Sequence, residues 1–146
     1  MGALPDRRTR PRVARILLAD GDLASRLAVK TLLSTAGYAV DGAASAAEAM
    51  ARLDSEEYQL VLADLRTESD EAGAQLLAFA RQKEYHPATA LISSHLSGRE
   101  GKKPPTAMES VVTVSDDTVS HLLAGVAELI GSRADRRMQQ ALRRAS

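Results

Sequence analysis

The chain has 146 residues and no formal net charge; 45% of its residues are hydrophobic and only 3% are aromatic. This length is typical of one domain with its own core, and the scarcity of aromatic residues predicts a core of aliphatic side chains and alanine. The absence of cysteine excludes disulfides, thiol catalysis and cysteine-ligated metals. No apolar run reaches the about 18 residues of a membrane-spanning helix, and no secretory signal is visible, so we expect a cytoplasmic protein.

The neutral total conceals an uneven distribution of charge. Residues 1–15 and residues 131–146 each carry five arginines and one aspartate, so each end has a net charge of +4 and the middle carries −8. Such ends are typical of solvated tails. Contact with nucleic acid is the alternative, but no aromatic residues stand among these arginines. We expect a flexible basic segment at 1–12, a folded domain at 13–130 and a basic helical extension at 131–146.

The first predicted elements are a strand, a helix and a second strand. The apolar run 13–19 predicts a strand that ends at Asp20. Asp22 is a good amino-terminal cap for the helix that follows, and Gly37 ends that helix. A short strand is predicted at 38–40.

The next helix and strand bring a second aspartate to the end of an apolar run. Ser45 and Glu48 have the spacing of a capping box, which predicts the start of a helix. The run 58–63 predicts a strand buried on both faces, and it ends at Asp64. Because the carboxyl ends of parallel strands meet at one edge of a sheet, we expect Asp64 to lie near Asp20, at the edge where ligands bind.

The second half continues the alternation with one interruption. A helix is predicted at about 71–83 and strands at 88–92 and 111–114. A helix is due between these two strands, but two glycines and two prolines within 95–106 disfavour one there. The alternation of strands and helices predicts an α/β fold around a parallel sheet.

The last predicted helix is unusually long. Its apolar stripe is strong from Val119 through Leu122 and continues more weakly past Gly131 to Met138 and Leu142. We expect Val119, Leu122, Met138 and Leu142 to form an interface with a partner. The alternative is a frayed extension or a linker to another part of a longer protein.

Four stretches of the chain together resemble the receiver domain of two-component response regulators: 15–20, 33–38, 48–53 and 60–64. The resemblance covers about residues 13–130. It implies a flavodoxin-like (CheY-like), doubly wound sheet of five parallel strands in the order 2-1-3-4-5, here with a degraded fourth helix.

The resemblance also implies a set of site residues. Asp64 stands at the position of the phosphoacceptor. Asp20, Asp64 and the backbone carbonyl of Arg66 stand where receivers bind Mg²⁺, whose hard charge suits oxygen ligands and offsets repulsion between carboxylate and phosphoryl group. Ser93 or Ser94 would supply the hydroxyl that contacts the phosphoryl oxygens.

The sequence departs from the family pattern within this site. Gly21 stands where receivers have a second acid, and Asp22 follows one residue late, either as an alternative metal ligand or only as a helix cap. The lysine that ends the fifth strand is absent, since Val114 and Ser115 stand there. The sequence therefore predicts a degenerate site with weak or no Mg²⁺ binding.

These observations favour a pseudo-receiver in a two-component phosphorelay. We expect it to act by protein–protein interaction with a histidine kinase, an output domain or another regulator, or as a homodimer through the last helix. One alternative is a working phosphoacceptor at Asp64 with Mg²⁺, and a second is a nucleic-acid-binding regulator that uses its basic ends. We expect no enzyme, because His86, His95 and His121 lack the spacing of metal ligands.

Overall fold

The computed structural model describes residues 13–65, 68–69, 71–94, 110–114 and 119–145. Strands and helices alternate from β1 to β4, as the predicted α/β class requires. The bounds of the elements are β1 (Arg15–Asp20), α1 (Leu23–Thr35), β2 (Ala39–Ala43), α2 (Ala46–Ser55), β3 (Leu60–Asp64), α3 (Ala72–Arg81), β4 (Ala88–Ser94), β5 (Ser110–Val114) and α4 (Val119–Ala145). The predictions for 1–12 and for a degraded helix at 95–106 fall outside the described residues.

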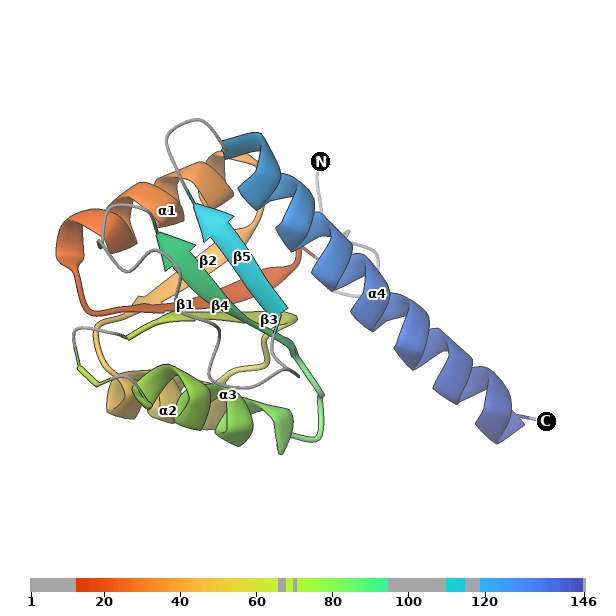
Figure 1. Ribbon diagram of the computed structural model, residues 1–146. Coiled ribbons are helices and arrows are strands. Elements are labelled where there is room, and N and C mark those ends of the chain that lie inside the picture. Colours follow the sequence, from red (N-terminus) through yellow and green to blue (C-terminus); the bar gives the residue numbers. More distant parts are fainter. Residues whose placement is uncertain (1–12, 66–67, 70, 95–109, 115–118, 146) are drawn as a thin grey trace, which may run out of the picture.

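The strands form one parallel sheet in the order β2-β1-β3-β4-β5, which confirms the predicted order. Helices cover both faces: α2 and α3 lie on one side, and α1 and α4 on the other (Figure 1). Alternate side chains of a strand point to opposite faces. Accordingly Leu17 and Val61 belong to the cluster under α2 and α3, whereas Ile16 and Leu62 belong to the cluster under α1 and α4. This double burial explains why the central strands are almost entirely apolar.

The predicted helix caps are present. Asp22 Oδ2 accepts a hydrogen bond from the backbone N–H of Ser25 at 3.0 Å, at the start of α1. Ser45 Oγ accepts from the N–H of Glu48 at 3.1 Å, and Glu48 Oε2 accepts from the N–H of Ala44 at 3.0 Å. The bond to Ser45 is the cap that the sequence predicted for α2, whereas Glu48 reaches the N–H of the residue before the cap instead of that of Ser45 itself.

Gly37 ends α1 with a φ of +105°, in the region that favours glycine, and a Cβ added there would meet no atom within 4 Å. We expect Gly37→Ala to lower the free energy of unfolding by about 1–2 kcal/mol through backbone strain alone. Gly131 is the matched control, because it also faces open space but lies within α4. Gly131→Ala should raise stability by about 0.5–1 kcal/mol. Thermal melts of both variants test these opposite effects on stability. Two shifts of the melting temperature in the same direction would contradict them.

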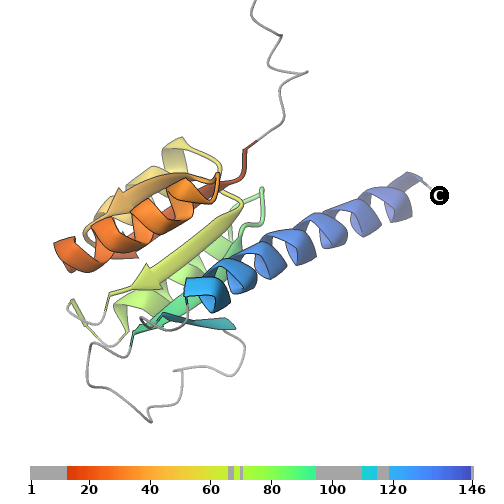
Figure 2. The same cartoon turned by 90° about the horizontal axis from the view of Figure 1, so that it is seen from above.

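Helix α4 continues from the body into an extension. It runs without interruption through Gly131 for 27 residues, and its last turns project away from the sheet (Figures 1 and 2). Leu122 is fully buried in the core, so its predicted role in a partner interface is wrong. Met138 and Leu142 are 65% and 64% exposed, whereas the side chain of Val119 lies outside the described set. Among the described helices, none combines the length and apolarity needed to cross a membrane.

Candidate functional site

The carboxyl edge of the sheet brings two aspartates together. Asp20 at the end of β1 and Asp64 at the end of β3 are register partners on adjacent strands. The backbone N–H of Gly21 donates to the carbonyl oxygen of Asp64 at 3.4 Å and holds the two strand ends side by side. The predicted meeting of Asp20 and Asp64 at this edge is therefore present.

Asp20 is a buried carboxylate, with only 3% of its surface exposed. Its Oδ1 accepts a hydrogen bond from the backbone N–H of Asp22 at 2.9 Å, whereas its buried Oδ2 has no hydrogen-bond partner within the described part of the chain. Burial raises the pKa of the Asp20 carboxyl. Hydrogen bonds from the backbone of Asp22 and the side chain of Ser25 oppose this shift, and the nearby charges of Asp64 and Asp22 raise the pKa further.

A third carboxylate does not join this pair. Asp22 directs its Oδ2 to the N–H of Ser25, so its observed role is that of the helix cap. Gly21, in the position of a second acid, offers no side-chain ligand. Across the described ranges, no three acidic, histidine or cysteine side chains lie together in a way that would hold a metal ion.

Arg26 is a cation near this edge that the sequence did not reveal. Its Nη1 donates to the backbone carbonyl of Asp20 at 2.7 Å. Its side chain crosses β2 beside Gly42, where an added Cβ would lie 3.3 Å from Arg26 Cδ. Glycine therefore makes room for the arginine stem. No local pattern relates position 42 to a residue on α1, so only the tertiary structure identifies this contact.

A second unpredicted contact joins the loop after Asp64 to α2. Glu68 Oε2 accepts a hydrogen bond from the backbone N–H of Ala46 at 3.0 Å. This places a carboxylate at the positive end of α2, where the helix dipole and free N–H groups favour negative charge. The loop that follows the candidate acceptor is thereby attached to a neighbouring helix.

The remaining predicted site residues are only partly placed. Strand β4 extends to Ser94, so Ser93 and Ser94 both stand at its carboxyl end, next to β5. The orientation of their side chains is not among the described features, and Arg66 lies outside the described residues. That Ser93 or Ser94 supplies the hydroxyl that contacts the phosphoryl oxygens stays a prediction.

The strand order and the paired aspartates at the carboxyl edge define a flavodoxin-like domain with an acidic site of the kind found in phosphoryl-accepting signalling domains. The chain belongs to the response regulator receiver domain family, whose family model matches residues 16–109. It is thus a receiver domain of the two-component systems. A comparison with curated protein sequences found no match.

Solved structures agree with this assignment. A response regulator receiver protein from Sinorhizobium medicae is 25% identical, with a TM-score of 0.68 over 83% of this chain and 97% of that one. NtrX from Brucella abortus, in complex with ADP, is 19% identical, with a TM-score of 0.73 over 90% of this chain and 29% of that one. The response regulator TrrA from Thermotoga maritima, in complex with Mg²⁺ and BeF, is 24% identical, with a TM-score of 0.63 over 80% of this chain and 99% of that one.

Receiver domains typically bind Mg²⁺ at the phosphorylation site, and the residues here fit that ion in part. The unpartnered buried oxygen of Asp20 and the adjacent Asp64 are hard oxygen donors of the type that Mg²⁺ prefers. When bound, the ion would offset repulsion between the acceptor and a phosphoryl group. Asp20 and Asp64 would hold it, without the further carboxylate that an acid in place of Gly21 would supply.

Proposed function

We propose that this receiver domain acts as a pseudo-receiver. It takes part in two-component signalling through contacts with other proteins, with little or no dependence on phosphorylation of Asp64. Its partners are signalling proteins of such a pathway, namely a histidine kinase, an output domain or another regulator. The signalling unit is the domain at 13–130, flanked by the basic segments 1–12 and 131–146.

The observation that carries this proposal is the role of Asp22. Asp22 directly follows Gly21 and is the acid that could replace the missing ligand, but its carboxylate caps α1. Turning that carboxylate toward Asp20 would leave the N–H of Ser25 without its partner, at a cost of about 1 kcal/mol. The displaced acid is therefore a poor substitute for the missing ligand.

The composition of β5 supports the same proposal. The strand reads Ser-Val-Val-Thr-Val and is followed by Ser115, so it contains no lysine. A transferred phosphoryl group needs cationic or hydrogen-bonding groups around its oxygens. With fewer such groups, an acyl phosphate on Asp64 gains less stabilisation from the protein.

The test is treatment with acetyl phosphate and Mg²⁺, and separately with beryllofluoride and Mg²⁺. We expect no phosphoryl adduct by intact-mass measurement and no Mg²⁺-dependent change in the amide NMR spectrum. A conventional receiver treated in parallel is the positive control. Gly21→Asp restores the missing acid and should increase the affinity for Mg²⁺, measured by titration.

A specific observation favours one rival, a working phosphoacceptor: the buried Oδ2 of Asp20 is available to a cation beside Asp64. Under that rival, the unsubstituted protein treated with acetyl phosphate and Mg²⁺ would gain the mass of a phosphoryl group, and Asp64→Asn would abolish the gain. This outcome would overturn the pseudo-receiver proposal.

The nucleic-acid rival receives less support from the contacts of the basic end. Arg133 and Arg137 direct their guanidinium groups to backbone carbonyls of Tyr85 and His86. They therefore contribute less to a free cationic surface than their number in the sequence indicates. Salt-dependent DNA binding that is lost on removal of 132–146 would revive this rival.

A further inference from the structure

The last turns of α4 form an exposed helix beyond the sheet. We name the part of α4 at 131–145 the helical extension, and it projects away from the body of the domain (Figures 1 and 2). Among its residues whose burial is described, only Arg133 is partly buried and the others are exposed. The extension therefore contributes little to the core, and most of its surface faces solvent.

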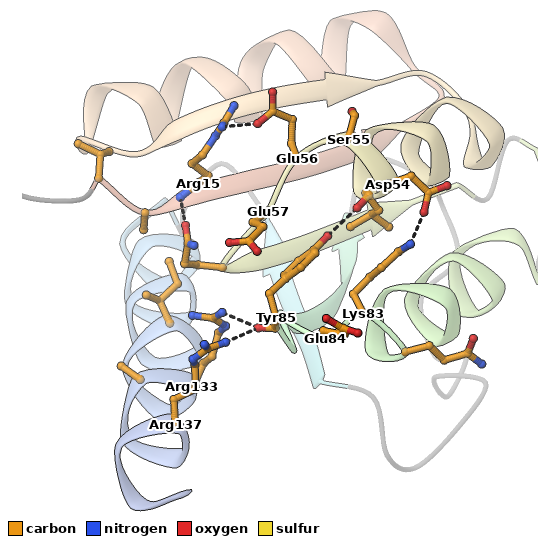
Figure 3. A pocket seen from close by; sticks show the side chains of 17 residues that line it. Arg15, Asp54, Ser55, Glu56, Glu57, Lys83, Glu84, Tyr85, Arg133 and Arg137 are labelled. Atoms are coloured by element: carbon orange, nitrogen blue, oxygen red, sulfur yellow. Dashed lines mark hydrogen bonds and ion pairs between the residues drawn. The ribbon is translucent and has the colours of Figure 1, made fainter. Parts of the chain in front are cut away.

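Two arginines fix the direction of the helical extension. Arg133 donates from Nη2 to the carbonyl of Tyr85 at 2.6 Å and from Nε to the carbonyl of His86 at 2.9 Å. Arg137 Nη1 donates to the same carbonyl of Tyr85 at 2.7 Å, and Figure 3 shows both side chains reaching across from the helix. The extension is thereby held in one orientation, and a preorganised surface loses less entropy when a partner binds.

One side of the helical extension has the pattern of a coiled-coil seam. Gly131, Ala134, Met138 and Ala141 follow one another at intervals of three and four residues, and all are exposed. Met138 is 65% exposed, and Leu142, which lies beside this seam, is 64% exposed. A Cβ added at Gly131 would meet no atom within 4 Å, so nothing in the described part of the chain covers the start of the seam.

The same helix carries positive charge that the domain leaves without an acidic counterpart. Residues 131–146 have a net charge of +4. Arg136 and Arg144 are exposed and take part in no ion pair among the described residues. The bonds of Arg137 are to a neutral carbonyl, so its charge is not neutralised. Arg137 and Arg144 are seven residues apart and therefore flank the seam on the same side.

We propose that the helical extension binds an acidic amphipathic helix of a partner signalling protein. Apolar side chains of that helix pack on the seam around Met138, and its carboxylates face Arg137 and Arg144. Because residues beside a coiled-coil seam select the partner through their charges, the partner carries acidic residues at the same seven-residue spacing. This inference rests on the proposed function, which requires contacts with other proteins, and it states the chemistry of one such partner.

Both the seam and the charge select this occupant over others. A second copy of the chain is disfavoured, because pairing two helical extensions brings two segments of net charge +4 together. A lipid surface takes up broad faces of large apolar and aromatic side chains, whereas Met138 and Leu142 are the only large apolar residues at 131–146. A nucleic acid would match the arginines but leave the seam in water. An acidic amphipathic helix covers the seam and offsets the charge.

The test is binding of a synthetic helical peptide to the full chain, measured by fluorescence anisotropy of the labelled peptide. The peptide has about three heptads, with leucine and alanine at the seam positions and glutamate at the flanking positions. We expect saturable binding that weakens as salt is raised. A peptide with lysine in place of every glutamate, and one that keeps the glutamates but has serine at the seam, should each bind at least about tenfold more weakly.

Variants of the protein locate the contact on the helix. Met138→Ser and Arg144→Glu should each weaken binding of the acidic peptide at least about tenfold. Arg136→Glu is the matched control, because it makes the same change of charge on the same helix but lies on the side opposite to the seam. It should weaken binding less than about threefold. All three positions are exposed, and circular dichroism checks that each variant is folded.

Several outcomes would overturn the proposal. They are no binding of the acidic peptide, equal binding of the peptide with serine at the seam, and equal losses for Arg136→Glu and Arg144→Glu. Tighter binding to phosphatidylserine vesicles or to duplex DNA than to the peptide would overturn it as well. The test involves no phosphorylation, so failure of peptide binding leaves the pseudo-receiver proposal standing, and a phosphoryl adduct on Asp64 would overturn that proposal alone.

Discussion

Replacement of Leu62 by alanine is expected to destabilise the protein by about 3 kcal/mol, within the roughly 2–5 kcal/mol range of buried leucine truncations. Leu62 is fully buried in β3, the central strand of the sheet, and belongs to the cluster beneath α1 and α4. Its neighbours come from several elements, so the cavity cannot close by the movement of one side chain. Thermal or urea unfolding monitored by circular dichroism measures the loss.

The chain offers a control with the same chemical change. Leu27 lies on α1 but is 53% exposed, so Leu27→Ala removes little buried surface and should change stability by no more than about 0.5 kcal/mol. The difference between the two leucines isolates burial from helix or strand propensity. Equal losses for both variants would contradict the assignment of Leu62 to a close-packed core.

The features that the sequence predicted well depend on neighbouring residues. The apolar strands ending at Asp20 and Asp64 are buried on both faces, and this leaves a continuous run that is visible in the sequence. The caps Asp22 and Ser45 act on the next turn of chain, and Gly37 acts on its own backbone. Because each signal lies within a few residues of its effect, no tertiary information is needed to read it.

The features that the sequence did not predict depend on distant partners. Arg15 was counted with a basic amino-terminal segment, but it pairs with Glu56, 41 residues away. Arg137 was counted with a basic tail, but it donates to the carbonyl of Tyr85, 52 residues away. A sequence does not show which groups a charged side chain contacts when its partners are distant along the chain. Composition alone therefore overstated how many basic side chains at both ends lack a partner.

The long helix illustrates the same limit for apolar residues. Leu122 and Met138 belong to one apolar pattern, yet Leu122 is fully buried and Met138 is 65% exposed. Periodicity indicates which side of a helix is apolar, but it does not indicate where the sheet beneath that helix ends. The position of that boundary decides which residues form core and which remain available to a partner.

Asp20→Asn is expected to stabilise the metal-free protein by about 1–3 kcal/mol, the range of the desolvation penalty of a buried polar group, because it removes a desolvated negative charge from beside Asp64. The carboxylate of Asp20 is desolvated, its Oδ2 has no hydrogen-bond partner among the described residues, and it lies beside Asp64. The amide of asparagine removes the charge while keeping the size of the side chain and the acceptor for the N–H of Asp22. Thermal unfolding in the presence of a chelator measures the gain.

The expected gain tests whether the carboxylate is retained at the expense of stability. Asp135→Asn is the control, because Asp135 is exposed on α4, and its replacement should change stability by no more than about 0.5 kcal/mol. A loss of stability on Asp20→Asn would mean that the buried charge makes a favourable contact at this edge. A gain would show that the desolvated carboxylate of Asp20 destabilises the protein, a cost that a bound cation would offset. Binding of Mg²⁺ should therefore stabilise the unsubstituted protein more than the asparagine variant.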